Sequence, residues 1–286
     1  MLLFTVFGLA PAVAVAYFAL TDATGVPGIP NHFVGLANFR QFFFGADSAE
    51  SWADIRRSLT YAVIVTVIQN ALALGIAVVL NGRIRGRTLV RVIVFAPTVL
   101  GVTVTALIWQ LAYSPVGGPA ASLLGAFGVH SAFLGSDSLA FALTIGVQIW
   151  MGLGYSMVIF LAGLQAIPGD LLEAATVDGA GTWRRFWRVT WPLLAPSVTA
   201  NILIAIIGSL QSYQLIYVLT GGLHNTGTLA YRIFQISFNV GTANGTQTQR
   251  FAEQGYGAAM SVIQFVIVSV IALIVLRFLR RREVQL

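Results

Sequence analysis

The residues best suited to chemistry with a partner lie in one stretch, Glu173 to Pro196, which reads EAATVDGAGTWRRFWRVTWPLLAP. Carboxylates, arginines and glycines interrupt the sequence here, whereas long apolar runs precede and follow the stretch. Charged side chains on a short helix offer polar and ionic contacts to another protein, and small residues beside them allow a close approach. The alternative is an ordinary amphipathic loop whose tryptophans anchor it at a membrane surface. Composition alone leaves both interpretations open.

Side chains that catalyse reactions are missing from the apolar runs. All three histidines, His32, His130 and His224, and all ten acidic residues fall outside these runs or at their edges. Hydrolysis within a membrane needs a nucleophile with a base, or a metal site, and ion-coupled transport ordinarily keeps ionisable groups at membrane depth. The sequence also lacks the G-x-x-x-x-G-K-[ST] loop that binds nucleotide phosphates. We therefore expect a chain that is not an enzyme, with no catalytic residue, no metal site and no cofactor of its own.

The apolar runs that must position the charged stretch indicate an all-α integral membrane protein. Of the 286 residues, 57% are hydrophobic and only 9% are charged. A helix needs roughly 20 mostly apolar residues to cross about 30 Å of hydrocarbon. Six runs qualify, and we predict a single transmembrane domain over residues 1–286 with six transmembrane helices: 1–20, 58–81, 92–114, 139–164, 197–219 and 257–279.

The arginines orient these runs. All 16 basic residues are arginine, and eleven of them fall on one side of the predicted membrane. By the positive-inside rule that side is cytoplasmic, which puts both termini in the cytoplasm. The net charge of +6 then reflects topology, and we expect no nucleic-acid partner. The eleven residues are Arg83, Arg85, Arg87, Arg91, Arg184, Arg185, Arg188, Arg277, Arg280, Arg281 and Arg282.

The first apolar run is open to a second interpretation. It begins at Met1 with no basic residue ahead of it, and Ala12-Val13-Ala14 resembles a signal-peptidase site. Removal of this run would leave five spans with the termini on opposite faces, and the missing basic region argues against removal.

Two outer loops contain apolar residues at helical spacing. Phe33, Leu36, Phe39, Phe42 and Phe43 form one set, and Leu229, Ile233 and Ile236 form the other. The spacing predicts short amphipathic helices along the outer surface. Packing over the rim of the bundle is their ordinary role, and contact with an external partner is the alternative.

The charged stretch belongs to a predicted cytoplasmic loop, residues 165–196. Leu171 to Val177 favour a helix, the glycines at 179 and 181 break it, and a second helix runs from Thr182 to Trp191.

This stretch resembles the cytoplasmic loop of ATP-binding-cassette (ABC) importer permeases, whose pattern is E-A-A-x-x-D-G-A, five residues, then F-x-x-I/V-x-x-P-x-x-x-P. Ten positions match: Glu173, Ala174, Ala175, Asp178, Gly179, Ala180, Phe186, Val189, Pro192 and Pro196. Similarity to the binding-protein-dependent carbohydrate-uptake branch, of the maltose and glycerol-phosphate type, extends over nearly the whole chain. FVGLANF at 33–39, AGLQAIP at 162–168 and YVLTGG at 217–222 carry it. The amino terminus departs from the branch, whose members usually begin with a basic stretch.

The resemblance implies a type I ABC importer permease in the bacterial inner membrane. Its partners would be a second homologous permease, two ATP-binding-cassette ATPase subunits that bind ATP and Mg²⁺, and an extracytoplasmic solute-binding protein that delivers a sugar. The loop helix would sit in a cleft of the ATPase and couple it to the bundle. Glu173 would contact the ATPase, Ala174 and Ala175 would permit close approach, and Gly179 would provide the bend before Ala180, with Asp178 completing the motif.

Two stripes of polar and aromatic residues are candidates for the solute path. Gln148, Met151, Gly152 and Tyr155 occur at i, i+3, i+4 and i+7, and Ser209, Ser212, Tyr213 and Ile216 repeat that spacing. Such surfaces suit sugars, because hydroxyls need hydrogen-bond partners and ring C–H faces pack on aromatic rings, and the resemblance points to the same positions. Small and polar residues also serve helix packing in membranes, so both roles stay open.

The sequence thus predicts a permease subunit of an ATP-driven sugar importer. The alternatives are a permease for another polar solute such as a glycerol-phosphate ester, an ion-coupled secondary transporter, and a membrane scaffold without transport.

Overall fold

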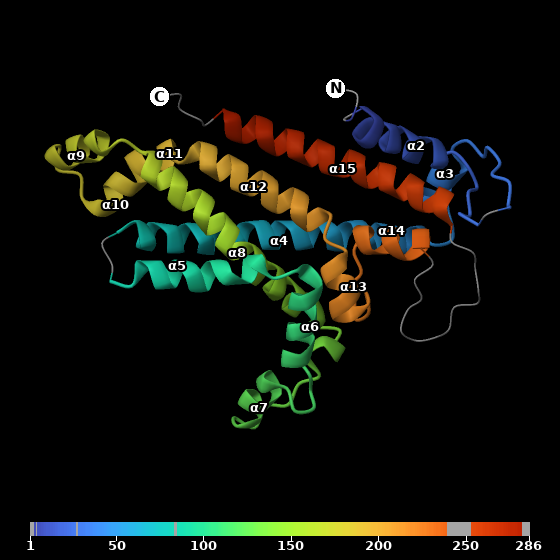
Figure 1. Ribbon diagram of the computed structural model, residues 1–286, viewed down its shortest axis with the longest axis horizontal. Helices are drawn as coiled ribbons and strands as arrows, with labels where there is room; N and C mark the ends of the chain where they lie inside the picture. Colours follow the sequence, from blue (N-terminus) through green and yellow to red (C-terminus); the bar gives the residue numbers. More distant parts are fainter. Residues whose placement is uncertain (1–2, 4, 27, 83–84, 239–252, 282–286) are drawn as a thin grey trace. The chain divides into compact units, whose positions relative to one another are not determined.

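The computed structural model describes residues 3, 5–26, 28–82, 85–238 and 253–281 (Figure 1). Within these ranges the chain forms helices and one isolated antiparallel bridge, between Thr21 and Phe33. The predicted all-α class is confirmed for this part of the chain.

Among the described residues, three helices are long and apolar enough to cross a membrane: α4 (Ser48–Asn81), α8 (Ala140–Ala166) and α15 (Gln254–Arg280). With 34 residues and a rise of 1.5 Å per residue, α4 is about 51 Å long, well beyond the roughly 30 Å of hydrocarbon. Its first turns are polar and carry Glu50 and Asp54, so they extend past the apolar part of the helix.

The predicted continuous helix over 92–114 is wrong. The chain forms α5 (Arg87–Phe95), a 3₁₀ turn η2 (Ala96–Val99) and α6 (Val102–Ala112), with a bend of 103° at the break. Pro97 lies in the first turn of η2, and Leu100 is extended with ψ 136°. Proline supplies no backbone N–H, so the helical hydrogen-bond ladder is interrupted near this point.

The predicted continuous helix over 197–219 is also wrong. It divides into α12 (Ala195–Leu210) and α13 (Gln214–Thr220), with residues 211–213 outside both. Near the break, the Ser209 hydroxyl donates a hydrogen bond of 2.6 Å to the carbonyl of Ala205. Such bonding to the preceding turn weakens and bends helices.

At the amino-terminal end, a π-helical turn η1 (Thr5–Leu9) leads into α2 (Ala10–Phe18), a shorter apolar stretch than a full span requires. By length and composition, the described residues provide three spans, or up to five if each bent pair counts as one. Met1, Leu2, Phe4 and residues 282–286 lie outside the description. Six helices and cytoplasmic termini therefore stay predictions.

The helices cluster into two compact units. Unit 1 comprises Met1–Tyr61, Ala106–Thr144 and Leu210–Ser269, and unit 2 comprises Ala62–Thr105, Ile145–Ser209 and Val270–Leu286.

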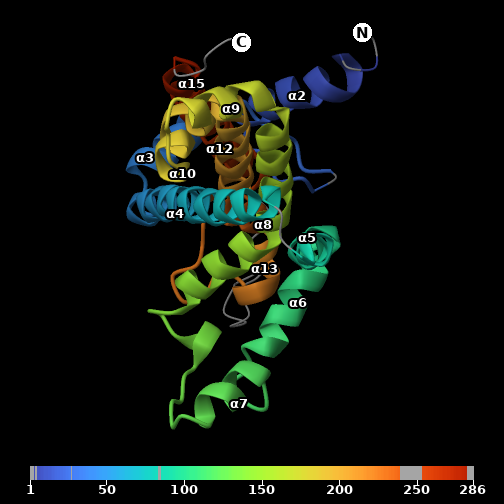
Figure 2. The same cartoon turned by 90° about the vertical axis from the view of Figure 1, so that its left-hand side faces the viewer.

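Unit 1 confirms the predicted amphipathic helix through Leu229, Ile233 and Ile236, as α14 (Leu229–Phe238). The other predicted set is confirmed in part: Phe39, Phe42 and Phe43 lie in α3 (Ala37–Phe44), whereas Phe33 and Leu36 precede it. The buried apolar cluster of unit 1 joins Phe42 of α3, Ile55 of α4, Leu229 of α14, and Met260 and Ile263 of α15. The short helix α7 (Pro119–Gly125) follows α6 in this unit (Figure 2), and a 3₁₀ turn η3 (Phe133–Gly135) precedes α8.

Ion pairs hold α14 against the first turns of α4 in unit 1. Asp54 pairs with Arg57, and it lies 3.4 Å from Arg232 of α14, which also reaches Glu50 at 2.7 Å. The Asp54 side chain is only 4% exposed, and that of Arg232 is 13% exposed. In addition, Arg57 Nε donates to the carbonyl of Gly227 at 2.7 Å.

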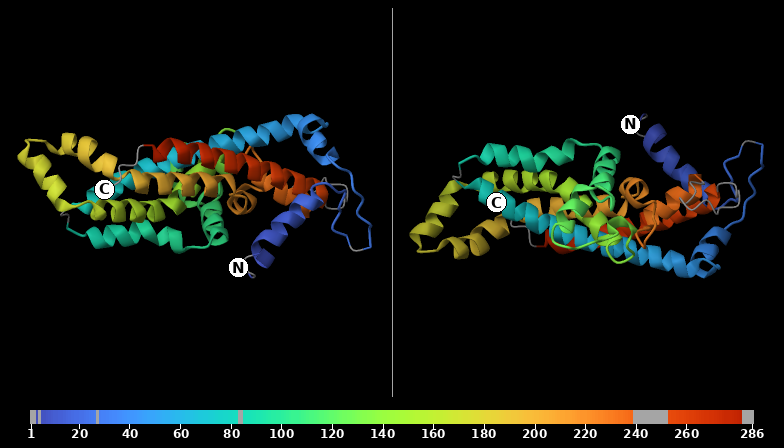
Figure 3. Two further views of the ribbon diagram at one scale, coloured as in Figure 1. Left: turned by 90° about the horizontal axis from the view of Figure 1, so that it is seen from above. Right: turned by 90° about the horizontal axis from the view of Figure 1, so that it is seen from below.

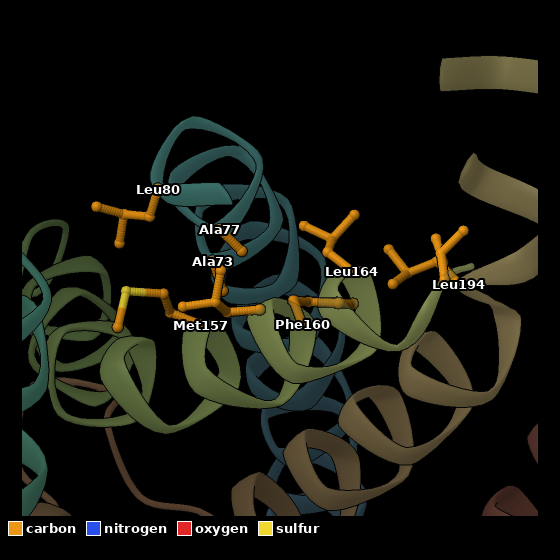
Figure 4. Close-up of a cluster of buried hydrophobic side chains, with 9 residues drawn as sticks. Ala73, Ala77, Leu80, Met157, Phe160, Leu164 and Leu194 are labelled. Atoms are coloured by element: carbon orange, nitrogen blue, oxygen red, sulfur yellow. The ribbon is translucent and has the colours of Figure 1, made fainter. Parts of the chain in front are cut away.

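Unit 2 is built on close helix contacts. Ala73 and Ala77 of α4 face Met157 and Phe160 of α8, with Leu194 buried in the same cluster (Figure 4). Helices α8 and α12 lie side by side in Figures 1 and 3. A Cβ added to Gly163 of α8 would come within 2.1 Å of Ser197 Oγ, so these two helices meet where only glycine leaves room.

Candidate functional site

The predicted cytoplasmic loop, 165–196, forms a helix, a tight turn and a second helical segment within unit 2. The helix is α9 (Gly169–Val177), and it begins directly after Pro168. Asp170 lies in its first turn, where a carboxylate interacts favourably with the helix dipole. The Thr176 hydroxyl bonds to the carbonyl of Leu172 at 2.8 Å. Local sequence therefore accounts for the helix without a large buried face.

The six residues that match the EAA motif line the outside of this helix and its turn. Glu173, Ala174, Asp178 and Gly179 are exposed, and the other two, Ala175 and Ala180, are half-buried. Neither carboxylate forms an ion pair or a side-chain hydrogen bond with any residue that the structure describes. The fold does not use their charges, so these side chains stay available to a partner.

The turn after α9 has the hydrogen bonds of a Schellman motif. Ala180 N–H donates to the carbonyl of Ala175 at 2.9 Å, and Gly179 N–H donates to that of Thr176 at 3.0 Å. Gly179 has φ +76°, a left-handed conformation that glycine adopts without steric cost. The bend expected at Gly179 is present.

The second segment consists of α10 (Thr182–Arg185), a π-helical turn η4 (Phe186–Thr190) and α11 (Trp191–Leu193). Arg185 Nη1 donates to Thr176 Oγ1 at 2.9 Å, which ties this segment to α9. At its far end, the axis bends by 67° into α12. A rigid, exposed helical hairpin thus leads directly into an apolar helix.

The first predicted solute stripe lies on one continuous helix, α8. Gln148, Met151 and Gly152 are half-buried, and Tyr155 is 50% exposed. The amide group of Gln69 in α4 covers Gly152, since a Cβ added there would come within 2.5 Å of Gln69 Oε1. Part of this stripe therefore takes part in helix packing.

The second predicted stripe does not have the expected geometry. Ser209 is buried near the end of α12, whereas Ser212 and Tyr213 lie in the break before α13. The Tyr213 ring stacks on Phe234 of α14 with centroids 4.9 Å apart. Helical spacing does not place these residues on one face, because the helix on which the spacing depends is interrupted. Their role in a solute path stays a prediction that depends on the resemblance to the family and not on helical spacing.

A buried polar cluster in unit 2 escaped the sequence analysis. Gln69 Nε2 of α4 donates to Ser156 Oγ of α8 at 2.8 Å, and Asn201 Nδ2 of α12 donates to the carbonyl of Ser156 at 3.1 Å. In the sequence, Gln69, Ser156 and Asn201 are single polar residues within three separate apolar runs. Their spacing does not show that they contact one another. The cluster joins three helices within the apolar part of the unit.

Comparisons with known proteins show similarity over most of the chain. Residues 69–284 match the family described as binding-protein-dependent transport system inner membrane component. The chain is 31% identical over 280 residues to the trehalose/maltose transport system permease protein MalF of Thermococcus litoralis, covering 97% of this chain and 90% of the relative. It is 30% identical over 259 residues to the sn-glycerol-3-phosphate transport system permease protein UgpA of Agrobacterium fabrum, covering 89% and 83%.

Solved structures show the same fold at lower identity. A chain from the crystal structure of a bacterial ABC transporter involved in the import of the acidic polysaccharide alginate matches with a TM-score of 0.79 and 21% identity, covering 98% of this chain and 92% of that one. A chain from the alginate transporter in complex with an alginate pentasaccharide-bound periplasmic protein matches with a TM-score of 0.76 and 19% identity, covering 98% and 91%.

Proposed function

Because this chain belongs to the family of binding-protein-dependent transport system inner membrane components, we propose that it is the membrane-spanning permease subunit of a bacterial ATP-driven sugar importer. The observation that carries the proposal is the exposed helix α9, where the motif-matching carboxylate of Glu173 pairs with no described residue and the small residue Ala174 is exposed beside it. The resemblance to a trehalose/maltose permease over nearly the whole chain supports a sugar as the solute.

In this proposal α9 couples the permease to ATPase subunits that bind ATP and Mg²⁺. Glu173 makes a polar or ionic contact with the ATPase, and Ala174 and Ala175 let the ATPase surface approach the helix closely. Gly179 fixes the hairpin through its left-handed turn. Movement of the ATPase is then transmitted through the second helical segment into α12, because the two segments follow one another in the chain.

The solute path is proposed to form with a second, homologous permease, and an extracytoplasmic binding protein delivers the sugar. Gln148, Met151, Gly152 and Tyr155 on α8 contribute to it, together with Ser209, Ser212 and Tyr213. The proposed topology has six transmembrane helices in the inner membrane and both termini in the cytoplasm, as the arginine distribution indicates.

A glycerol-phosphate ester is the second candidate solute, because UgpA of Agrobacterium fabrum is 30% identical to this chain. Uptake of labelled saccharides and of labelled glycerol phosphate by a deletion strain carrying this transporter distinguishes the two solutes.

Two substitutions test the coupling role of α9. Glu173→Lys reverses the exposed charge, and Gly179→Asp adds a charge at a position whose left-handed conformation aspartate tolerates better than most residues. We expect both to abolish uptake while the permease still assembles in the membrane. Val177→Ser is the matched control, because Val177 is 87% exposed on the same helix and lies at a variable position of the motif. Normal uptake in both charged variants would remove the coupling assignment.

A further inference from the structure

Unit 2 contains an open groove whose role the transport proposal does not explain. Its volume is about 640 Å³, within the range of ligand-binding pockets. Helices α4, α8 and α12 form part of its wall, and the second helical segment of the loop forms the rest. The lining residues that bear on its ligand are Thr66, Gly75 and Val78 of α4 and Trp183, Trp187 and Trp191 of the loop segment.

The groove is long, and most of its lining is apolar. Along α4 it extends from Val78 to Thr66, about 18 Å at 1.5 Å per residue, which is more than half the thickness of the hydrocarbon core. A Cβ added to Gly75 would meet no atom within 4 Å, so the middle of this wall faces open space. A soluble polar ligand would find few partners here, whereas a flexible hydrocarbon chain would contact apolar side chains along the groove.

Tryptophans form one wall of the groove. The ring centroids of Trp183 and Trp187 are 5.6 Å apart, as are those of Trp187 and Trp191. Trp183 is nevertheless 74% exposed, and Trp187 is 46% exposed. Tryptophan is enriched where the hydrocarbon meets the headgroups, so this wall marks the level at which a lipid passes from headgroup to tail.

Two arginines are the chain neighbours of these tryptophans. Arg184 and Arg188 are exposed and follow Trp183 and Trp187 directly in the chain. Neither forms an ion pair or a hydrogen bond with a residue that the structure describes, whereas their neighbour Arg185 donates to Thr176. Neither arginine lines the groove itself, but on this helical segment they form the stripe next to the tryptophans that do. Two unpaired guanidinium groups at this edge are complementary to a ligand with an anionic head and a hydrocarbon tail.

We propose that the groove binds one anionic glycerophospholipid, with an acyl chain between α4 and the tryptophan wall and the headgroup phosphate at Arg184 and Arg188. The lipid would brace the coupling hairpin against α4 and α12. Placing it in the cytoplasmic leaflet rests on the proposed topology, but the groove and its charges do not depend on which solute the protein carries.

The test uses the complete purified transporter in nanodiscs of phosphatidylglycerol, of phosphatidylcholine, or of both, with retained lipids counted by native mass spectrometry. We expect the wild type to retain phosphatidylglycerol in preference to phosphatidylcholine. Gly75→Leu places a side chain across the middle of the α4 wall, where the groove is open, and should strongly reduce retention. Gly146→Leu is the matched control, because Gly146 also has open space at its Cβ but lies outside the groove. Arg184→Gln with Arg188→Gln should reduce the preference for phosphatidylglycerol by roughly tenfold or more.

Three outcomes would overturn the proposal. The first is a wild type that retains no phosphatidylglycerol, and the second is equal retention by Gly75→Leu and Gly146→Leu. The third is a Gly75→Leu variant that loses a partner protein subunit instead of a lipid, which would show that protein covers the groove. Sugar uptake by the same variants is measured separately in sealed proteoliposomes of the same lipids, so a failure of lipid binding with normal uptake leaves the transport proposal standing.

Discussion

Two groups of carboxylates in this protein have opposite surroundings. In unit 1, Asp54 is 4% exposed and lies between Arg57 and Arg232. In unit 2, Glu173 and Asp178 are exposed, and no described residue pairs with them. The first group holds α14 against α4, whereas the second contributes nothing visible to its own fold. The buried carboxylate belongs to the fold, whereas the exposed ones at the turn after α9 are the residues that the proposed coupling role uses.

The largest expected effect separates these two groups directly. Asp54→Ala removes the buried carboxylate that the half-buried Arg57 and Arg232 share, and we expect the free energy of unfolding to fall by about 3 kcal/mol. Glu173→Ala should change it by no more than about 0.5 kcal/mol. Chemical unfolding of the detergent-solubilised protein measures both. Glu50→Gln removes the more exposed of the two carboxylates that pair with Arg232 and should cost less than Asp54→Ala. Equal losses for Asp54→Ala and Glu173→Ala would erase the contrast.

In unit 2, we expect close contact between helix backbones to stabilise the fold, as ion pairs do in unit 1. A Cβ added to Gly154 of α8 would lie 2.5 Å from the carbonyl oxygen of Val94 in α5. Gly154→Ala should therefore destabilise the protein by about 2 kcal/mol. Gly146→Ala on the same helix meets no atom and should stabilise it by up to about 1 kcal/mol. Thermal unfolding in detergent shows whether the two shifts have opposite signs; shifts of the same sign would contradict the packing argument.

A smaller effect is expected at the polar cluster of unit 2. Gln69→Leu removes the hydrogen bond to Ser156, and such bonds between membrane helices contribute about 0.6 kcal/mol on average. We expect a loss of about that size by the same unfolding measurement. A loss as large as that of Asp54→Ala would mean that this cluster, and not close packing alone, holds unit 2 together.

The smallest effect concerns an exposed carboxylate that the fold does use. The backbone N–H of His32 donates to Asp22 and lowers the pKa of that carboxyl below its ordinary value of 3.8, with smaller contributions from the His32 side chain. A lowered folded-state pKa contributes stability above the ordinary value, and that stability is lost as the pH falls through the lowered one. Asp22→Asn should therefore melt slightly below the wild type at pH 7, and the difference should shrink at pH 3. A constant difference would exclude the charge as its cause.

The sequence predicts the helical class, the amphipathic helix α14, part of α3, and the hairpin with its bend at Gly179, because each depends on local composition and spacing. It does not predict the breaks at residues 100–101 and 211–213. An apolar run has the same composition whether its helix is continuous or interrupted, so the stripe through Ser209, Ser212 and Tyr213 was inferred from a helix that ends at Leu210.

Contacts between distant segments are also beyond local reasoning. Asp54 and Arg232 come together from opposite parts of the chain, and the sequence gives no sign that they pair. The residues of the α9 motif were found because they resemble a family pattern, and their lack of partners within the chain is a structural finding.

The bend of 67° between the second loop segment and α12 has a mechanical consequence. Because the two helix axes meet at this angle, a force along the first axis has only a small component along the second. A displacement of α10 and α11 along their own direction would act on the end of α12 mostly sideways. The helix would therefore tilt, with the tight contact between Gly163 and Ser197 as its fulcrum, and would not slide past α8.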